Sequence, residues 1–74
     1  MKEVINGIVI TIEETKSSYV LKIFHNNRSI TVDRFNKNKE GAYQNALYYF
    51  KKIKEELKEK IREKGVNLAL VEFL

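Results

Sequence analysis

The chain contains no cysteine, no proline and no tryptophan, and it has a single histidine. Without cysteine it can form neither a disulfide framework nor a thiolate zinc site, so neither can hold the fold together. Apolar packing, alone or with a partner chain, must therefore supply the stability. The absence of cysteine also fits a reducing compartment.

Long apolar runs are absent as well. No stretch approaches the ~18 residues of a membrane span, and the first residues lack the apolar segment of a secretory signal. We therefore expect a cytoplasmic protein that does not enter a membrane. With 74 residues, the chain has the length of one small domain over positions 1–74.

Residues for catalysis or cofactor binding are scarce. His25 flanks a turn and has no carboxylate near it in the sequence, and Asp33 is the only aspartate, whereas a metal site or a catalytic triad needs three or more groups. The adjacent Glu13 and Glu14 would point to opposite faces of a strand. The isolated glycines form no phosphate-binding loop. We expect no enzyme, no metal, no cofactor and no small-molecule substrate.

Three segments have the alternating, β-branched pattern of strands, and they cover residues 8–13, 19–25 and 28–35. A polar turn separates the first two. Asn26 and Asn27 favour a two-residue hairpin loop between the last two, because asparagine tolerates positive φ.

This loop predicts the register of the hairpin, from His25 opposite Arg28 to Leu21 opposite Val32. One face of the hairpin is then aliphatic. The other is mostly polar, and its residues are Val20, Lys22, Phe24, Ser29, Thr31 and Asp33. Such a division is typical of a sheet with one covered side.

From about Lys39 the apolar period changes to three or four residues, which predicts one long helix. Its apolar stripe consists of Ala42, Ala46, Tyr49, Phe50, Ile53, Leu57 and Ile61. We expect Asn36 or Asn38 to cap its start and Gly65 to follow its end. At ~1.5 Å per residue such a helix is longer than a strand of eight residues, so it should overhang the sheet.

The tail over residues 66–74 has apolar residues at both odd and even positions, which is unusual for a solvated terminus. It could return as a short fourth strand parallel to the third, or pack on the overhang or on a second subunit. The expected fold class is therefore α+β. It has a three-stranded antiparallel sheet packed on one long C-terminal helix, with either a fourth strand (β-β-β-α-β) or a packed tail.

Positive charge is concentrated in the middle of the chain. The net charge is +4. Residues 22–54 carry eight lysines or arginines against one aspartate and one glutamate, a net +6, while the flanking segments are each at −1. Such an excess attracts polyanions such as nucleic acid. It also serves solubility, and a merely solvated basic surface remains an alternative.

The order of elements resembles a known type of DNA-binding domain. Three strands, then Glu40-Gly41-Ala42 and a long helix with Ala46 and aromatic residues, resemble the three-stranded-sheet-plus-helix domains. These include the arm-binding domains of tyrosine integrases and the ethylene-response-factor type. The resemblance implies that the sheet face enters the major groove. The stretch from Glu40 to Leu57 also resembles the helix of HicB-type antitoxins, which bind a protein partner.

Together these patterns predict a small basic protein that binds double-stranded DNA. The candidate contact residues are Lys22, Phe24, Arg28, Thr31, Arg34, Lys37, Lys51 and Lys54. The alternative is a protein-interaction module, such as a small inhibitor or antitoxin-like protein. It would use the helix overhang and residues 66–74, and a homodimer through these surfaces is one form of this alternative.

Overall fold

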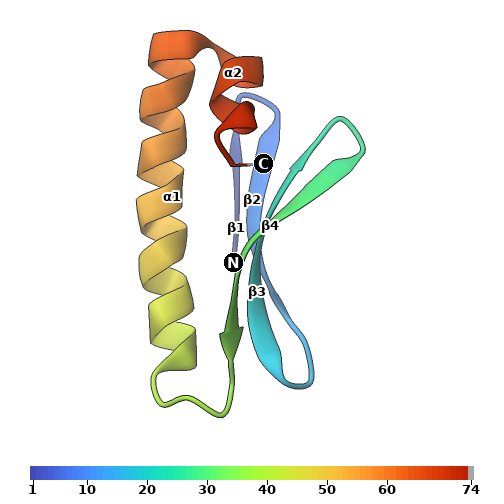
Figure 1. The fold of residues 1–74 in the computed structure, drawn as a ribbon, viewed down its shortest axis with the longest axis vertical. Helices are drawn as coiled ribbons and strands as arrows, with labels where there is room; N and C mark the ends of the chain where they lie inside the picture. Colours follow the sequence, from blue (N-terminus) through green and yellow to red (C-terminus); the bar gives the residue numbers. More distant parts are fainter. Residues whose placement is uncertain (74) are drawn as a thin grey trace.

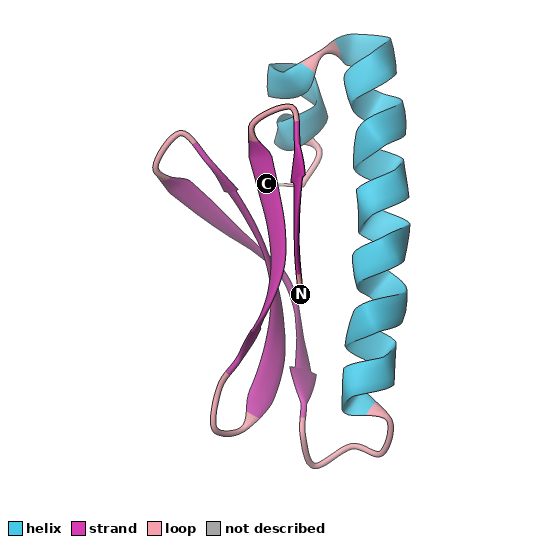
Figure 2. Cartoon of the chain, turned by 180° about the vertical axis from the view of Figure 1, so that it is seen from behind, coloured by secondary structure: helices cyan, strands magenta, loops and turns pink. Residues whose placement is uncertain are grey.

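A computed structural model of the chain describes residues 1–73, and within them the protein is a four-stranded antiparallel sheet with helices on one side (Figures 1 and 2). The strands follow each other in the order β1-β2-β3-β4. The elements are β1 (Lys2–Ile5), β2 (Ile8–Glu14), β3 (Ser18–His25), β4 (Arg28–Asn36), α1 (Ala42–Lys64) and α2 (Val66–Val71). The α+β class is confirmed, but the prediction of three strands was one strand short.

The additional strand is β1, at the edge of the sheet. It pairs with β2 from Lys2 opposite Thr11 to Ile5 opposite Ile8. Asn6 (φ 49°) and Gly7 (φ 81°) connect the two strands. Positive φ at both central residues is the mark of a type I′ turn, whose twist matches that of the strands it joins.

The β3–β4 hairpin follows the predicted register over its outer half. Asn26 and Asn27 form the loop with φ of 49° and 64°, and the pairs from His25–Arg28 to Lys22–Thr31 are as expected. The register then shifts between Leu21 and Lys22, so that Leu21 lies opposite Asp33 rather than Val32. The predicted pairing of Leu21 with Val32 and the predicted position of Asp33 on the polar face were therefore wrong, because a β-bulge inserts one extra residue into β4.

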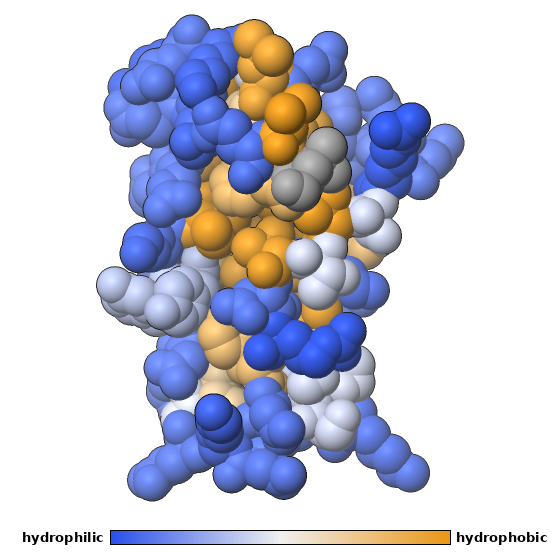
Figure 3. All heavy atoms as spheres, viewed as in Figure 1, coloured by the Kyte–Doolittle hydropathy of each residue, from blue (hydrophilic) through white to orange (hydrophobic). Residues whose placement is uncertain are grey.

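The core lies between the sheet and α1. Its buried residues are Ile8, Ile10, Leu21, Ile23, Phe50, Leu57 and Ala69. They come from β2, β3 and both helices, so alternation in the strands and the helical stripe of α1 meet in one cluster. Figure 3 shows apolar side chains reaching the surface between α1 and the sheet and beside α2.

The ends of α1 are set by glycines. Gly41 precedes the helix in a left-handed conformation, and no side chain caps it. The predicted cap by Asn36 or Asn38 was wrong, because the Asn36 side chain instead accepts a hydrogen bond from the backbone N–H of Asn38 at 2.8 Å. The predicted stop at Gly65 is confirmed by its φ of 85° and by its N–H, which donates to the carbonyl of Ile61.

The tail forms α2, which folds back beside α1 (Figure 1). Up to Phe73 it is a packed tail and not a strand; Leu74 lies outside the described residues. Val66, Ala69, Leu70 and Phe73 pack on or into the core. Their spacing of three, four and seven residues is helical, which explains why the tail pairs with no strand edge.

Candidate nucleic-acid interface

One face of the sheet carries no helix in the part of the chain that the structure describes. Figure 2 shows α1 and α2 on the same side of the four strands, with the opposite side bare. We call this bare side the outer face. Because α1 and the core hold the sheet from behind, the accessible side chains of the outer face can contact another molecule. Val20 lies on this face but is only 2% exposed, so it is not one of them.

The strand register arranges the outer face in three rows that run across the strands. The first row is Val4, Val9, Phe24 and Ser29. The second is Lys2, Thr11, Lys22 and Thr31. The third is Glu13, Val20 and Arg34. An apolar row therefore lies beside a row of amines and hydroxyls, with a charged row beyond it.

The bulge in β4 decides the charge of the third row. In an unbroken strand Asp33 would lie opposite Val20, but the register shift puts Arg34 there. The Asp33 carboxylate accepts a hydrogen bond from the backbone N–H of Arg34 at 2.8 Å. The three rows therefore hold three cations and one carboxylate, and the outer face is basic.

Two contacts orient the cations of this face. Lys22 Nζ lies 3.5 Å from Glu13 Oε2. Arg34 Nη1 donates to Ser18 Oγ at 3.5 Å. An ion pair this close to solvent contributes about 0–1 kcal/mol, so a phosphate can displace the carboxylate at little cost. The Arg34 contact is long and engages one of five guanidinium donors, which leaves the others available.

Phe24 adds an apolar wall to the outer face. It borders a shallow hollow of about 360 Å³, together with Lys2, Val9, Thr11 and Glu13. Phe24 and Val9 are half-buried even though no helix covers them. An aromatic ring in this position can contact a thymine methyl group or stack on an unpaired base.

The structure divides the predicted contact residues between several surfaces. Lys22, Phe24, Thr31 and Arg34 share the outer face. Arg28 does not, because it lies opposite His25, on the side of the sheet that faces the helices. The outer face gains Lys2, which sequence reasoning missed because it missed β1. Alternation in β2 already indicates that Thr11 lies on this face, but Thr11 was not among the predicted contact residues.

The remaining three predicted residues lie away from this face. Lys37 follows β4, where its Nζ lies 2.6 Å from Glu14 Oε2 and 5.1 Å from the centre of the Tyr19 ring. Lys54 of α1 lies 3.7 Å from Glu3 Oε1. Lys51 is exposed on α1. The basic segment 22–54 therefore does not form one continuous patch.

Residues 1–73 contain no group of three His, Asp or Glu side chains able to hold a metal ion. Over the same residues, no helix is both long and apolar enough to cross a membrane. Comparisons with protein families, curated proteins and solved structures gave no match. The resemblance to sheet-plus-helix DNA-binding domains stays a prediction.

Proposed function

We propose that this protein binds nucleic acid, and double-stranded DNA in particular, through the outer face of its sheet. One observation carries the proposal: the register places Lys2, Lys22 and Arg34 on an uncovered face with only Glu13 against them. Lysine and arginine at such a face supply the phosphate contacts that dominate affinity for DNA.

The neighbouring side chains add groups that can read bases. Thr31 and Ser29 offer hydroxyls, which can hydrogen-bond to base edges in the major groove, and Phe24 offers apolar contact. The hydroxyl of Thr11 donates to the carbonyl of Met1 at 3.1 Å, so it is available as an acceptor. These groups lie in the rows next to the cations. One docked orientation therefore lets cations meet phosphates while hydroxyls face bases.

The width of the sheet limits how it can dock. Four strands at ~4.8 Å spacing are ~14 Å across before side chains are counted, which exceeds the ~12 Å major groove. A two-stranded ribbon fits the groove. Figures 1 and 2 show the tip of the β3–β4 hairpin diverging from the β1–β2 turn. We expect this hairpin, with Lys22 and Thr31, to enter the groove while β1 and β2 face the phosphates.

The test is a pair of charge-neutralising double variants that differ only in the face they alter. Lys22→Gln with Arg34→Gln removes two cations from the outer face. Lys52→Gln with Arg62→Gln removes two exposed cations from α1 and is the matched control. Binding of each to a labelled mixed-sequence duplex is followed by fluorescence anisotropy between roughly 50 and 200 mM salt.

Each phosphate contact contributes about −0.9 to the slope of log K against log salt. The outer-face double variant should therefore bind more weakly and lose about 1.8 from this slope. The control should keep most of the wild-type slope. Equal losses in both variants, or no binding by the wild type at low salt, would refute binding through the outer face.

A second candidate function is protein interaction through α2. Leu68 and Val71 are 60% and 57% exposed on this short helix, and apolar side chains exposed side by side mark contact surfaces. This surface lies apart from the outer face. An interaction there would be unaffected by the substitutions at Lys22 and Arg34.

A further inference from the structure

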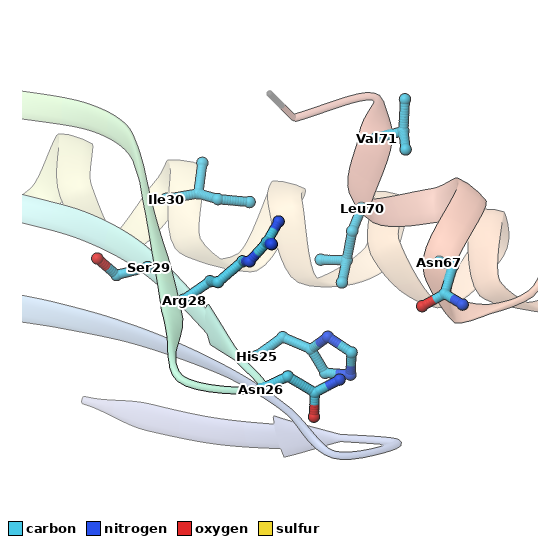
Figure 4. Close-up of a pocket in the computed structure, with 8 residues that line it drawn as sticks. All are labelled: His25, Asn26, Arg28, Ser29, Ile30, Asn67, Leu70 and Val71. Carbon is cyan, nitrogen blue, oxygen red and sulfur yellow. The ribbon is translucent and has the colours of Figure 1, made fainter.

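We propose that the groove between the β3–β4 hairpin tip and α2 binds a small carboxylate that carries an apolar body. The groove encloses about 480 Å³ and is lined by His25, Asn26, Arg28, Ser29, Ile30, Asn67, Leu70 and Val71 (Figure 4). Ligand sites for small molecules commonly have volumes of ~300–1,000 Å³. The proposal concerns the helix side of the sheet and does not rest on nucleic-acid binding.

The polar side chains of the groove suit an anion. His25, Asn26 and Asn67 can each donate a hydrogen bond, and none of the eight lining residues is acidic. Within residues 1–73, Arg28 belongs to none of the ion pairs. Its guanidinium is therefore available, and its planar fork matches the two oxygens of a carboxylate.

The apolar side chains of the groove suit a hydrocarbon body. Ile30 and Leu70 are half-buried and pack on the edge of the core. Figure 4 shows Leu70 of α2 projecting toward the side of the hairpin from which Arg28 extends, whereas Ser29 points away to the outer face. A ligand with its charge at Arg28 can therefore lay its apolar part on Ile30 and Leu70.

One guanidinium group beside aliphatic side chains favours a ligand that has a single carboxylate and an apolar part. A phosphate dianion favours several cations and exposes no apolar surface, so Ile30 and Leu70 would add nothing to its binding. A carboxylate with a short hydrocarbon chain uses both parts of the groove. Arg28 lies on this side of the hairpin because it alternates with Ile30, but the groove exists only because the tail folds back as α2.

The test is an NMR titration of the ¹⁵N-labelled full chain with three probes. Hexanoate carries both features of the proposed ligand, 1-hexanol carries the apolar part alone, and inorganic phosphate carries charge alone. Hexanoate should give saturable shifts in the millimolar range, concentrated at His25, Arg28 and Leu70. The other two probes should bind at least several-fold more weakly.

Substitutions then assign the charge contact. Arg28→Gln should weaken hexanoate binding about tenfold, as expected for loss of a charge-assisted hydrogen bond. Lys51→Gln, an exposed cation on α1, should not change it. The proposal is overturned by any of three results: no hexanoate shifts, equal binding of hexanol or phosphate, or equal binding by Arg28→Gln. Binding of duplex DNA through the outer face would be unaffected in each case.

Discussion

Asp33 and Arg34 show how much a single inserted residue can change at a surface. The bulge leaves one residue of β4 without a partner on β3 and reverses the alternation that follows it. Arg34 therefore joins Val20 on the outer face, while Asp33 lies opposite the buried Leu21. The basic character of the outer face depends on this shift and not on composition alone.

Gly7 is the residue at which backbone strain can be tested most simply. It has a φ of 81°, and a Cβ added there would meet no atom within 4 Å. Any effect of Gly7→Ala is therefore backbone strain, which costs an L-residue about 1–2 kcal/mol in the left-handed region. We expect the free energy of unfolding, measured by urea denaturation, to fall by about that amount.

The control for this prediction is Gln44→Ala, at an exposed position in α1, where surface substitutions change stability by only about 0.5 kcal/mol or less. If Gly7→Ala were as stable as the wild type, the tight turn between β1 and β2 would be disproved. The assignment of β1, the strand that the sequence analysis did not predict, would then be in question.

Besides its apolar packing on the core, the end of α2 is tied to α1 by charged contacts. Glu72, directly after this helix, accepts hydrogen bonds from Lys60 and Lys64 of α1. The bond from Lys60, then that from Lys64, lowers the pKa of Glu72 from 4.5 to about 2. The same contact raises the pKa of Lys60. These side chains are solvent-accessible, so salt screens the interaction and its contribution to stability is small.

The lowered pKa predicts how α2 responds to acid. A carboxylate whose pKa is lower when folded stabilises the folded state above its unfolded pKa, and this stabilisation disappears as pH falls toward the folded pKa. Docking of α2 should therefore weaken between pH 4.5 and about 2. The amide shifts of Ala69 and Leu70, followed by NMR, report this change.

Glu72→Gln removes the titrating group and is the control. Its α2 amides should already resemble those of the acidified wild type at neutral pH and should change little between pH 4.5 and 2. Identical acid titrations of α2 in the two proteins would show that the contacts of Glu72 do not hold this helix.

Most elements of the fold were readable from local patterns. Alternation placed β2, β3 and β4, and the period of α1 placed the long helix. The Asn26-Asn27 loop predicted the register of the hairpin correctly over its outer half, as far as Lys22 and Thr31. β1 was missed although Asn6-Gly7 is a strong type I′ turn signal. The signal for α2 is a set of apolar residues at helical spacing. It could not be told from a strand pattern, because the tail has apolar residues at both odd and even positions.

The bulge left a signal that was not used. Ile30 and Val32 alternate, but the next apolar residue is Phe35, three positions further on. An unbroken strand would turn Arg34 toward the core and Phe35 away from it, whereas the shifted register lets Phe35 pack against the core.

The position of Arg28 could also have been predicted. Arg28 precedes Ile30 by two residues, so alternation alone assigns both side chains to the helix side of the sheet. The prediction grouped Arg28 with Lys22 and Arg34 because all three are basic, and it did not take this alternation into account.

At the scale of the whole molecule, stability and binding belong to opposite sides of the sheet. The core cluster lies between the sheet and the helices. The outer face contributes Lys22, Thr31 and Arg34, none of which belongs to that cluster. Substitutions on the outer face should therefore change binding while the protein stays folded. The proposed function can then be tested by locating the residues that contact DNA.

The most direct test of the central claim is NMR mapping of the ¹⁵N-labelled protein during titration with an unlabelled duplex at low salt. Binding through the outer face predicts shifts concentrated at Thr11, Lys22, Thr31 and Arg34, with α1 nearly unchanged and the shifts suppressed at high salt. Shifts confined to the lysines of α1, or no shifts at all, would contradict the claim that the outer face binds DNA.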